Sequence, residues 1–216
     1  MFKNEMQKIT DASLKKIEFM KKSPLGYIIL SALAGVYLGF GITLIFSVGG
    51  PIADTGGGAY LKLIMGASFG IALSLVIFAG SELFTGNNMI FAISGLAKRV
   101  GVGPIVILFT MCFIGNFIGS AFIGWLVVQG DSLPQASQAL VLKVAAMKMG
   151  LGAKEAFLRG VLCNWLVCLA VWLSLRMQSE TAKLIMIFWC LFAFIASGFE
   201  HSIANQSLLS RAMSLP

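Results

Sequence analysis

Long apolar stretches separated by shorter polar ones dominate this chain. About 20 apolar residues are enough for a helix to cross the hydrocarbon core of a bilayer. Five apolar stretches occupy roughly residues 24–48, 60–97, 103–128, 156–175 and 183 onward. A polar stretch at 129–154, with Pro134 and three lysines, separates the third from the fourth. The pattern predicts an all-α, polytopic membrane helical bundle.

Polar residues interrupt the second and the fifth apolar stretch. Residues 80–88 read Gly-Ser-Glu-Leu-Phe-Thr-Gly-Asn-Asn, and residues 197–205 read Ser-Gly-Phe-Glu-His-Ser-Ile-Ala-Asn. Each contains a glutamate, three further residues, a small residue and an asparagine. Irregular backbone at membrane depth must be enclosed by protein or line a wet cavity, because its polar groups have no other partners. We therefore expect two broken helices beside a substrate path.

The two interruptions occupy corresponding places in two successive three-span units. Such units enter the membrane from opposite sides, which is the inverted-repeat pattern of many transport proteins. We expect a transmembrane bundle over 24–216, with repeats at about 24–128 and 156–216. Only 11 residues follow Asn205, enough for about 17 Å of helix. We therefore expect the second repeat to be incomplete, with a sixth span missing.

Composition and charge place the chain in a membrane. It is 58% hydrophobic and only 12% charged, with a mean hydropathy of +0.90, whereas soluble domains carry about 25% charged residues. Residues 1–23 are polar and lysine-rich and predict a cytoplasmic amphipathic segment. Basic residues beside the spans favour a cytoplasmic N-terminus in the inner (plasma) membrane. No nucleotide-binding or nucleic-acid-binding motif is visible, so we expect neither a cofactor nor a nucleic-acid partner.

Ionisable side chains at the interruptions are costly in a membrane and need partners. Glu82 and Glu200 are expected to accept hydrogen bonds from freed amides, and Asn87 and Asn205 to tie the breaks together. His201 is the single histidine of the sequence. A histidine can carry a proton near neutral pH, so this residue is the strongest functional candidate.

Three motifs resemble the signatures of the formate/nitrite transporter family in order and spacing. They are Ser-Glu-Leu-Phe-Thr-Gly at 81–86, Cys-Asn-Trp-Leu-Val-Cys at 163–168 and Phe-Ile-Ala-Ser-Gly-Phe-Glu-His-Ser-Ile-Ala-Asn at 194–205. The resemblance spans roughly Pro24 to Asn205, and the wording is most similar to the nitrite-channel branch. It implies an aquaporin-like helical fold and a homopentamer in which each protomer has its own pore.

The resemblance also implies roles for individual residues. The family's central histidine corresponds to His201, its broken-loop threonine to Thr85, its fourth-helix asparagine to Asn164 and its pore-facing loop lysine to Lys148. Hydrophobic constrictions are implied at Phe69, Leu73, Phe84 and Phe194. No metal ligand and no catalytic residue is expected.

A comparison of free energies suggests how an anion could cross. In the idealised limit, moving a bare anion into low dielectric costs about 20 kcal/mol. Protonating a carboxylate of pKa about 3.7 at pH 7 costs about 4.5 kcal/mol. We therefore predict transport of a small monovalent anion, with nitrite as the lead substrate and formate or hydrosulfide as alternatives, and with transient protonation at His201.

Other classes fit the sequence less well. A water or glycerol channel would carry asparagine-proline-alanine boxes, which both interruptions lack. An intramembrane enzyme would need a pattern such as His-Glu-x-x-His or a nucleophile with a base, and the sequence offers neither. A truncated, non-transporting membrane remnant stays open as an alternative.

Overall fold

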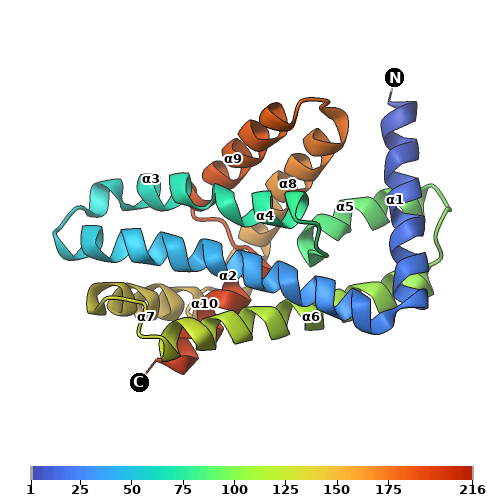
Figure 1. The fold of residues 1–216 in the computed structure, drawn as a ribbon. Coiled ribbons are helices and arrows are strands. Elements are labelled where there is room, and N and C mark those ends of the chain that lie inside the picture. The colour runs from blue at the N-terminus through green and yellow to red at the C-terminus, as the bar shows by residue number, and fades with distance from the viewer. Residues whose placement is uncertain (1, 216) are drawn as a thin grey trace.

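The computed structural model describes residues 2–215, and this part of the chain is built of helices joined by short connections (Figure 1). Four helical stretches are long and apolar enough to cross a membrane: α2, α3 together with α4, α6, and α8. The helices are α1 (Lys3–Lys22), α2 (Pro24–Asp54), α3 (Gly58–Ser68), α4 (Gly70–Phe78), α5 (Phe84–Leu96), α6 (Val102–Gln129), α7 (Gln135–Met149), α8 (Ala153–Arg176), α9 (Glu180–Ala196) and α10 (Ser202–Ser214).

Small residues bring α2 and α6 together along much of their length (Figure 1). A Cβ atom at Gly119 would overlap the backbone carbonyl of Ala32, and one at Gly35 would overlap the carbonyl of Asn116. Glycine at these two positions therefore lets the two backbones approach closely, as is common between membrane helices. α10 packs against the same pair of helices.

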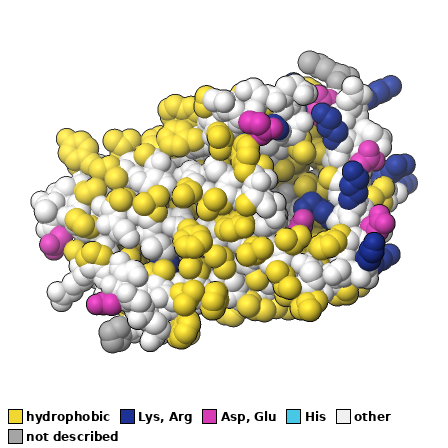
Figure 2. All heavy atoms as spheres, in the orientation of Figure 1, with side chains coloured by type: hydrophobic (Ala, Val, Ile, Leu, Met, Phe, Trp, Pro, Cys, Tyr) yellow, Lys and Arg dark blue, Asp and Glu magenta, His cyan; other side chains and the backbone are white. Residues whose placement is uncertain are grey.

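α1 lies across one end of the bundle and crosses the direction of α2 and α6 (Figure 1). Its apolar side chains Ile9, Ile17 and Met20 are buried, and it packs mainly against α5 and α2. Charged side chains gather at this end of the molecule, whereas apolar side chains cover most of the flank seen in Figure 2. An amphipathic helix in this position suits the boundary between membrane and water.

The polar stretch 129–154 is not simply a connection, because it contains helix α7. α7 packs against α2 and α10 and buries Ser137, Leu140, Val141 and Ala145. These residues recur at helical spacing among polar ones, and at 15 residues the helix is shorter than a full span. Lys148, which the resemblance implied to be a loop lysine, therefore lies on a helix.

The two broken helices predicted from the sequence are confirmed, and their backbones match. Gly80 and Gly198 end the first half-helices with φ of +75° and +72°, values that glycine adopts without steric cost. The Glu82 amide donates to the carbonyl of Leu30 on α2 at 3.2 Å, and the Glu200 amide donates to that of Arg159 on α8 at 3.3 Å. Both acceptors lie six residues after the start of their helices, so the two breaks are anchored in corresponding ways.

Candidate functional site

His201 lies at the second break, immediately before α10, with only 5% of its surface exposed. Its Nδ1 accepts a hydrogen bond from the Ala204 amide at 3.1 Å, and its Nε2 lies 3.1 Å from Thr85 Oγ1. Because Nδ1 is an acceptor, the proton of the neutral ring is on Nε2, which donates to Thr85. The first broken helix thereby contacts the second through one hydrogen bond.

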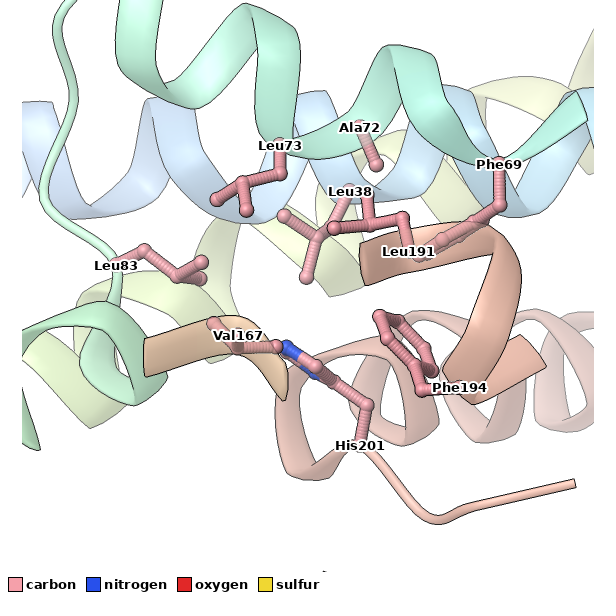
Figure 3. Close-up of a pocket in the computed structure, with 9 residues that line it drawn as sticks. All are labelled: Leu38, Phe69, Ala72, Leu73, Leu83, Val167, Leu191, Phe194 and His201. Carbon is pink, nitrogen blue, oxygen red and sulfur yellow. The ribbon is translucent and has the colours of Figure 1, made fainter. Parts of the chain in front are cut away.

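A small cavity lies between this histidine and the middle of the bundle (Figure 3). The cavity volume is about 10 Å³, which is space for about one water molecule. Apart from His201, its lining is apolar, so an ion that entered would lose most of its hydration shell. The lining residues are Leu38, Phe69, Ala72, Leu73, Leu83, Val167, Leu191, Phe194 and His201.

The cavity has aromatic side chains on one part of its wall. The rings of Phe69 and Phe194 meet edge to face with centroids 5.7 Å apart, and Phe194 stacks on His201 at 5.7 Å. Phe69, Leu73 and Phe194, three of the four residues expected at constrictions, therefore line one cavity together.

Phe84, the fourth expected constriction residue, lies elsewhere. Its ring packs against Phe109 and Phe113 with centroid distances of 5.4 and 5.2 Å, and the preceding residue, Leu83, lines the cavity instead. Leu83 is in extended conformation at the start of α5. Helical periodicity does not apply to an extended residue, so the sequence pattern could not show which of these two side chains turns inward.

Lys148 forms an ion pair at the second break. Its ammonium lies 2.6 Å from Glu200 Oε2, and Asn205 Nδ2 donates to the same oxygen at 2.8 Å. Only 9% of Glu200 is exposed, so these two partners satisfy a nearly buried carboxylate. The structure thus adds a lysine to the glutamate and the asparagine that the sequence motif already places together.

A second group of the same composition lies at the first break. The ammonium of Lys16 on α1 lies 2.5 Å from Glu82 Oε1, while Asn87 Nδ2 donates to Glu82 Oε2 at 3.0 Å. Tyr27 adds a longer hydrogen bond to the same oxygen at 3.3 Å. Lys16 was not among the residues predicted from the sequence, although the likeness between the two breaks points to a counterpart of Lys148.

Wider cavities adjoin the central one. One of about 390 Å³ is lined by Lys16, Glu82 and Asn87 and shares Leu73 and Leu83 with the central cavity. Another, of about 180 Å³, shares His201 with the central cavity and is also lined by residues of both breaks and of α8. The lining of this last cavity consists of Thr85, Asn88, Gly160, Cys163, Asn164, Glu200, His201 and Ser202.

Asn164 faces this last cavity without bonding to the histidine. Its Oδ1 accepts from Asn88 Nδ2 at 3.1 Å, and its own amide approaches Cys168 Sγ at 3.3 Å. In the described residues, therefore, Thr85 is the side chain that holds His201. Asn164 instead joins α8 to α5 beside the cavity.

Asn116 on α6 supports the backbone of the first break. Its Nδ2 donates to the carbonyls of Ser31 and Glu82 at 2.7 and 2.8 Å, and its Oδ1 accepts from the Phe84 amide at 2.9 Å. These bonds satisfy backbone groups that the break frees. Within residues 2–215, no group of three or more His, Cys, Asp or Glu side chains could hold a metal ion.

Comparisons with known proteins agree with this architecture. The family model described as formate/nitrite transporter matches residues 3–216. The nitrite transporter NirC of Salmonella typhimurium is 41% identical over 211 residues, covering 97% of this chain and 77% of its own length. A probable formate transporter of Methanothermobacter thermautotrophicus is 39% identical over 207 residues, covering 88% and 76%.

Solved structures show the same fold. A structure described as an FNT family ion channel superposes with a TM-score of 0.92 and 38% identity, covering 99% of this chain and 84% of that one. A pentameric formate channel with formate bound gives a TM-score of 0.79 and 27% identity, covering 89% and 76%. Together with the helices that can span a membrane, these matches make the chain a multi-pass membrane protein. The chain belongs to the formate/nitrite transporter family.

Proposed function

We propose that this chain conducts a small monovalent anion across the membrane, with nitrite as its lead substrate. One observation carries the proposal: His201, bonded to Thr85, lines an apolar cavity of about 10 Å³, and a lysine–glutamate–asparagine group lies at each break. The similarity to the nitrite transporter NirC supports nitrite. A formate relative and a formate-bound structural neighbour favour formate as the second candidate.

Anions are attracted to the path from both sides in this account. Lys16 and Lys148 lie at opposite breaks, each paired with a glutamate, so most of their charge is compensated locally. The N-termini of α5 and α10 begin at the two breaks. The partial positive charge at a helix N-terminus attracts anions, and half-helices in transporters are used in this way.

The central cavity then requires the anion to shed its water. Space for about one water leaves no room for a hydration shell. A bare ion in such surroundings costs several kcal/mol even after relaxation, whereas protonation of a weak acid anion costs about 4.5 kcal/mol at pH 7 when its pKa is about 3.7. Crossing as the neutral acid is the lower-energy route.

His201 provides the proton in this mechanism. At rest its ring is neutral, because Nδ1 accepts from Ala204 and Nε2 donates to Thr85. To act as an acid, the ring must first release Ala204 and take up a proton on Nδ1 from water. It then passes the Nε2 proton through the Thr85 hydroxyl to the anion and is neutral again with its proton on Nδ1. The acid crosses and releases its proton to water on the far side. The ring returns to its resting state when Nδ1 gives its proton to water and Nε2 takes one up through Thr85, so that Nδ1 can again accept from Ala204.

The proposal also covers the oligomeric state of the protein and its orientation in the membrane. We propose a homopentamer in the inner membrane with a cytoplasmic N-terminus, each protomer holding its own path for anion and proton. A pentameric neighbour and the basic α1 helix support this arrangement. The path uses no cofactor and releases its substrate unchanged. We therefore propose a transport protein and not an enzyme.

The test is a substrate panel. Protein reconstituted into liposomes is assayed by stopped-flow for uptake of nitrite, formate, hydrosulfide and, as a doubly charged control, sulfate, at two pH values. We expect nitrite to be fastest and sulfate to be excluded. If formate or hydrosulfide were taken up fastest, that anion would replace nitrite as the proposed substrate. Equal leakage of all four anions would contradict a selective path.

A further inference from the structure

A polar cluster lies away from the central path, where α2, α6 and α10 meet. Arg211 on α10 is 0% exposed. Its Nη2 donates to Thr43 Oγ1 at 2.7 Å and to the Gly39 carbonyl at 3.4 Å, while Nε and Nη1 are buried without a partner in the described structure. One turn earlier, Ser207 bonds to Ser120 of α6 at 2.9 Å.

Within the described part of the chain, Arg211 forms no ion pair. The ion pairs of residues 2–215 join other groups, and the partners of this guanidinium are a hydroxyl and a carbonyl. A guanidinium stays protonated in proteins, and a buried charge is normally paired. Among residues 2–215, Arg211 is therefore a buried cation without a counter-charge, unlike Lys16 and Lys148, which are both paired.

This cation lies close behind the wall of the central cavity. Gly39, whose carbonyl it contacts, directly follows Leu38, a lining residue of the cavity. Side chains of a helix lean toward its N-terminus, and α10 begins next to His201, so the guanidinium reaches back toward the cavity. For an estimate of the effect, we take the charge and the cavity to be about one helix diameter, roughly 12 Å, apart.

We propose that Arg211 raises the affinity of the central path for an anion, because its charge stabilises the anion until His201 protonates it. The inference rests on the proposed anion path. Two unit charges about 12 Å apart at an effective dielectric constant of about 20 attract each other enough to change an equilibrium constant about tenfold. Salt screens a buried pair only weakly. The residue acts through space and does not touch the anion.

Compensating the charge in place tests this role without emptying the site. Thr43→Asp puts a carboxylate beside the guanidinium, whereas Thr43→Asn has nearly the same shape and no charge. Nitrite affinity is measured from the nitrite-dependent rise in melting temperature of purified protein, and nitrite flux is measured in liposomes. We expect Thr43→Asp to weaken the affinity and lower the flux about tenfold, and Thr43→Asn to leave both near wild type.

A second pair of variants changes the cation itself. Arg211→Met is expected to behave like Thr43→Asp, and Arg211→Lys to keep most of the wild-type affinity. Equal nitrite affinities in Thr43→Asp and Thr43→Asn, or equal losses in Arg211→Met and Arg211→Lys, would overturn the inference. If nitrite affinity changes with charge among these variants but wild-type protein shows no nitrite flux, the proposed transport fails while the role of Arg211 stands.

Discussion

The ammonium of Lys16 lies 2.5 Å from a carboxylate oxygen of Glu82, although 66 residues separate them in the chain. Lys148 and Glu200 form the matching pair at 2.6 Å on the other broken helix. An asparagine five residues after each glutamate completes both groups. The two breaks thus share their partners as well as their backbone, and both ends of the proposed path carry the same set of charges.

Removing either lysine should impair both stability and transport. Lys16→Met or Lys148→Met leaves a nearly buried glutamate with neutral partners only, which costs about 1–3 kcal/mol. We expect lower melting temperatures and a nitrite flux reduced several-fold. The exposed residues Lys15 and Lys143 lie on the same helices, and their replacement by Met serves as the control. Equal effects in test and control variants would contradict a specific role for the pairs.

The hydroxyl of Thr85 should matter more than its bulk. In Thr85→Val the histidine Nε2 loses its described hydrogen-bond partner, so we expect nitrite flux to fall at least tenfold with little loss of folded protein. Thr85→Ser keeps the hydroxyl and should retain most of the flux. The measurement is stopped-flow uptake at matched protein content, and wild-type flux in Thr85→Val would rule out the proton relay through this residue.

Leu83 and Phe84 should respond differently to substitution. Leu83→Ala enlarges a cavity that now has room for about one water, so we expect faster uptake and weaker discrimination between nitrite and larger anions. Phe84→Leu disturbs the packing on Phe109 and Phe113 and should lower thermal stability without changing selectivity. If only Phe84→Leu altered the selectivity, Phe84 and not Leu83 would be the constriction residue.

The glycines that end the half-helices should be sensitive for conformational reasons. Gly80 and Gly198 have positive φ and open space around them, so replacement by Ala meets only backbone strain, at about 1–2 kcal/mol each. We expect lower melting temperatures for both variants. Gly58 also has open space but lies in α3 without a positive φ, so Gly58→Ala should match or exceed wild-type stability. Unchanged melting temperatures in all three variants would contradict the positive φ of Gly80 and Gly198.

Hydrophobic pattern and motif spacing were sufficient to predict the helical bundle and both broken helices. A long apolar stretch with a polar interruption is a local feature, so it is visible in the sequence. The pairing of Lys16 with Glu82 is not local, because it depends on how α1 folds across the end of the bundle. In the sequence Lys16 is one of several lysines in a polar segment, and only its packing distinguishes it.

Two further features depended on details that periodicity does not contain. The extended backbone at Leu83 decides that this side chain, and not Phe84, faces the cavity. The burial of Arg211 also could not be predicted, since an arginine near the end of the chain is usually exposed. Its environment arises from the crossing of α10 with α2 and α6, which are distant in the sequence.

The most direct test of the central claim is nitrite uptake by wild-type protein and His201→Phe in liposomes, measured by stopped-flow from acidic to neutral pH. Phenylalanine keeps an aromatic ring beside Phe194 but has neither a proton to give nor a bond to Thr85. We expect selective wild-type uptake that depends on pH, and a flux in His201→Phe that is at least tenfold lower or has lost its pH dependence. Unchanged rate and pH dependence in His201→Phe would contradict a path that protonates its anion at this histidine.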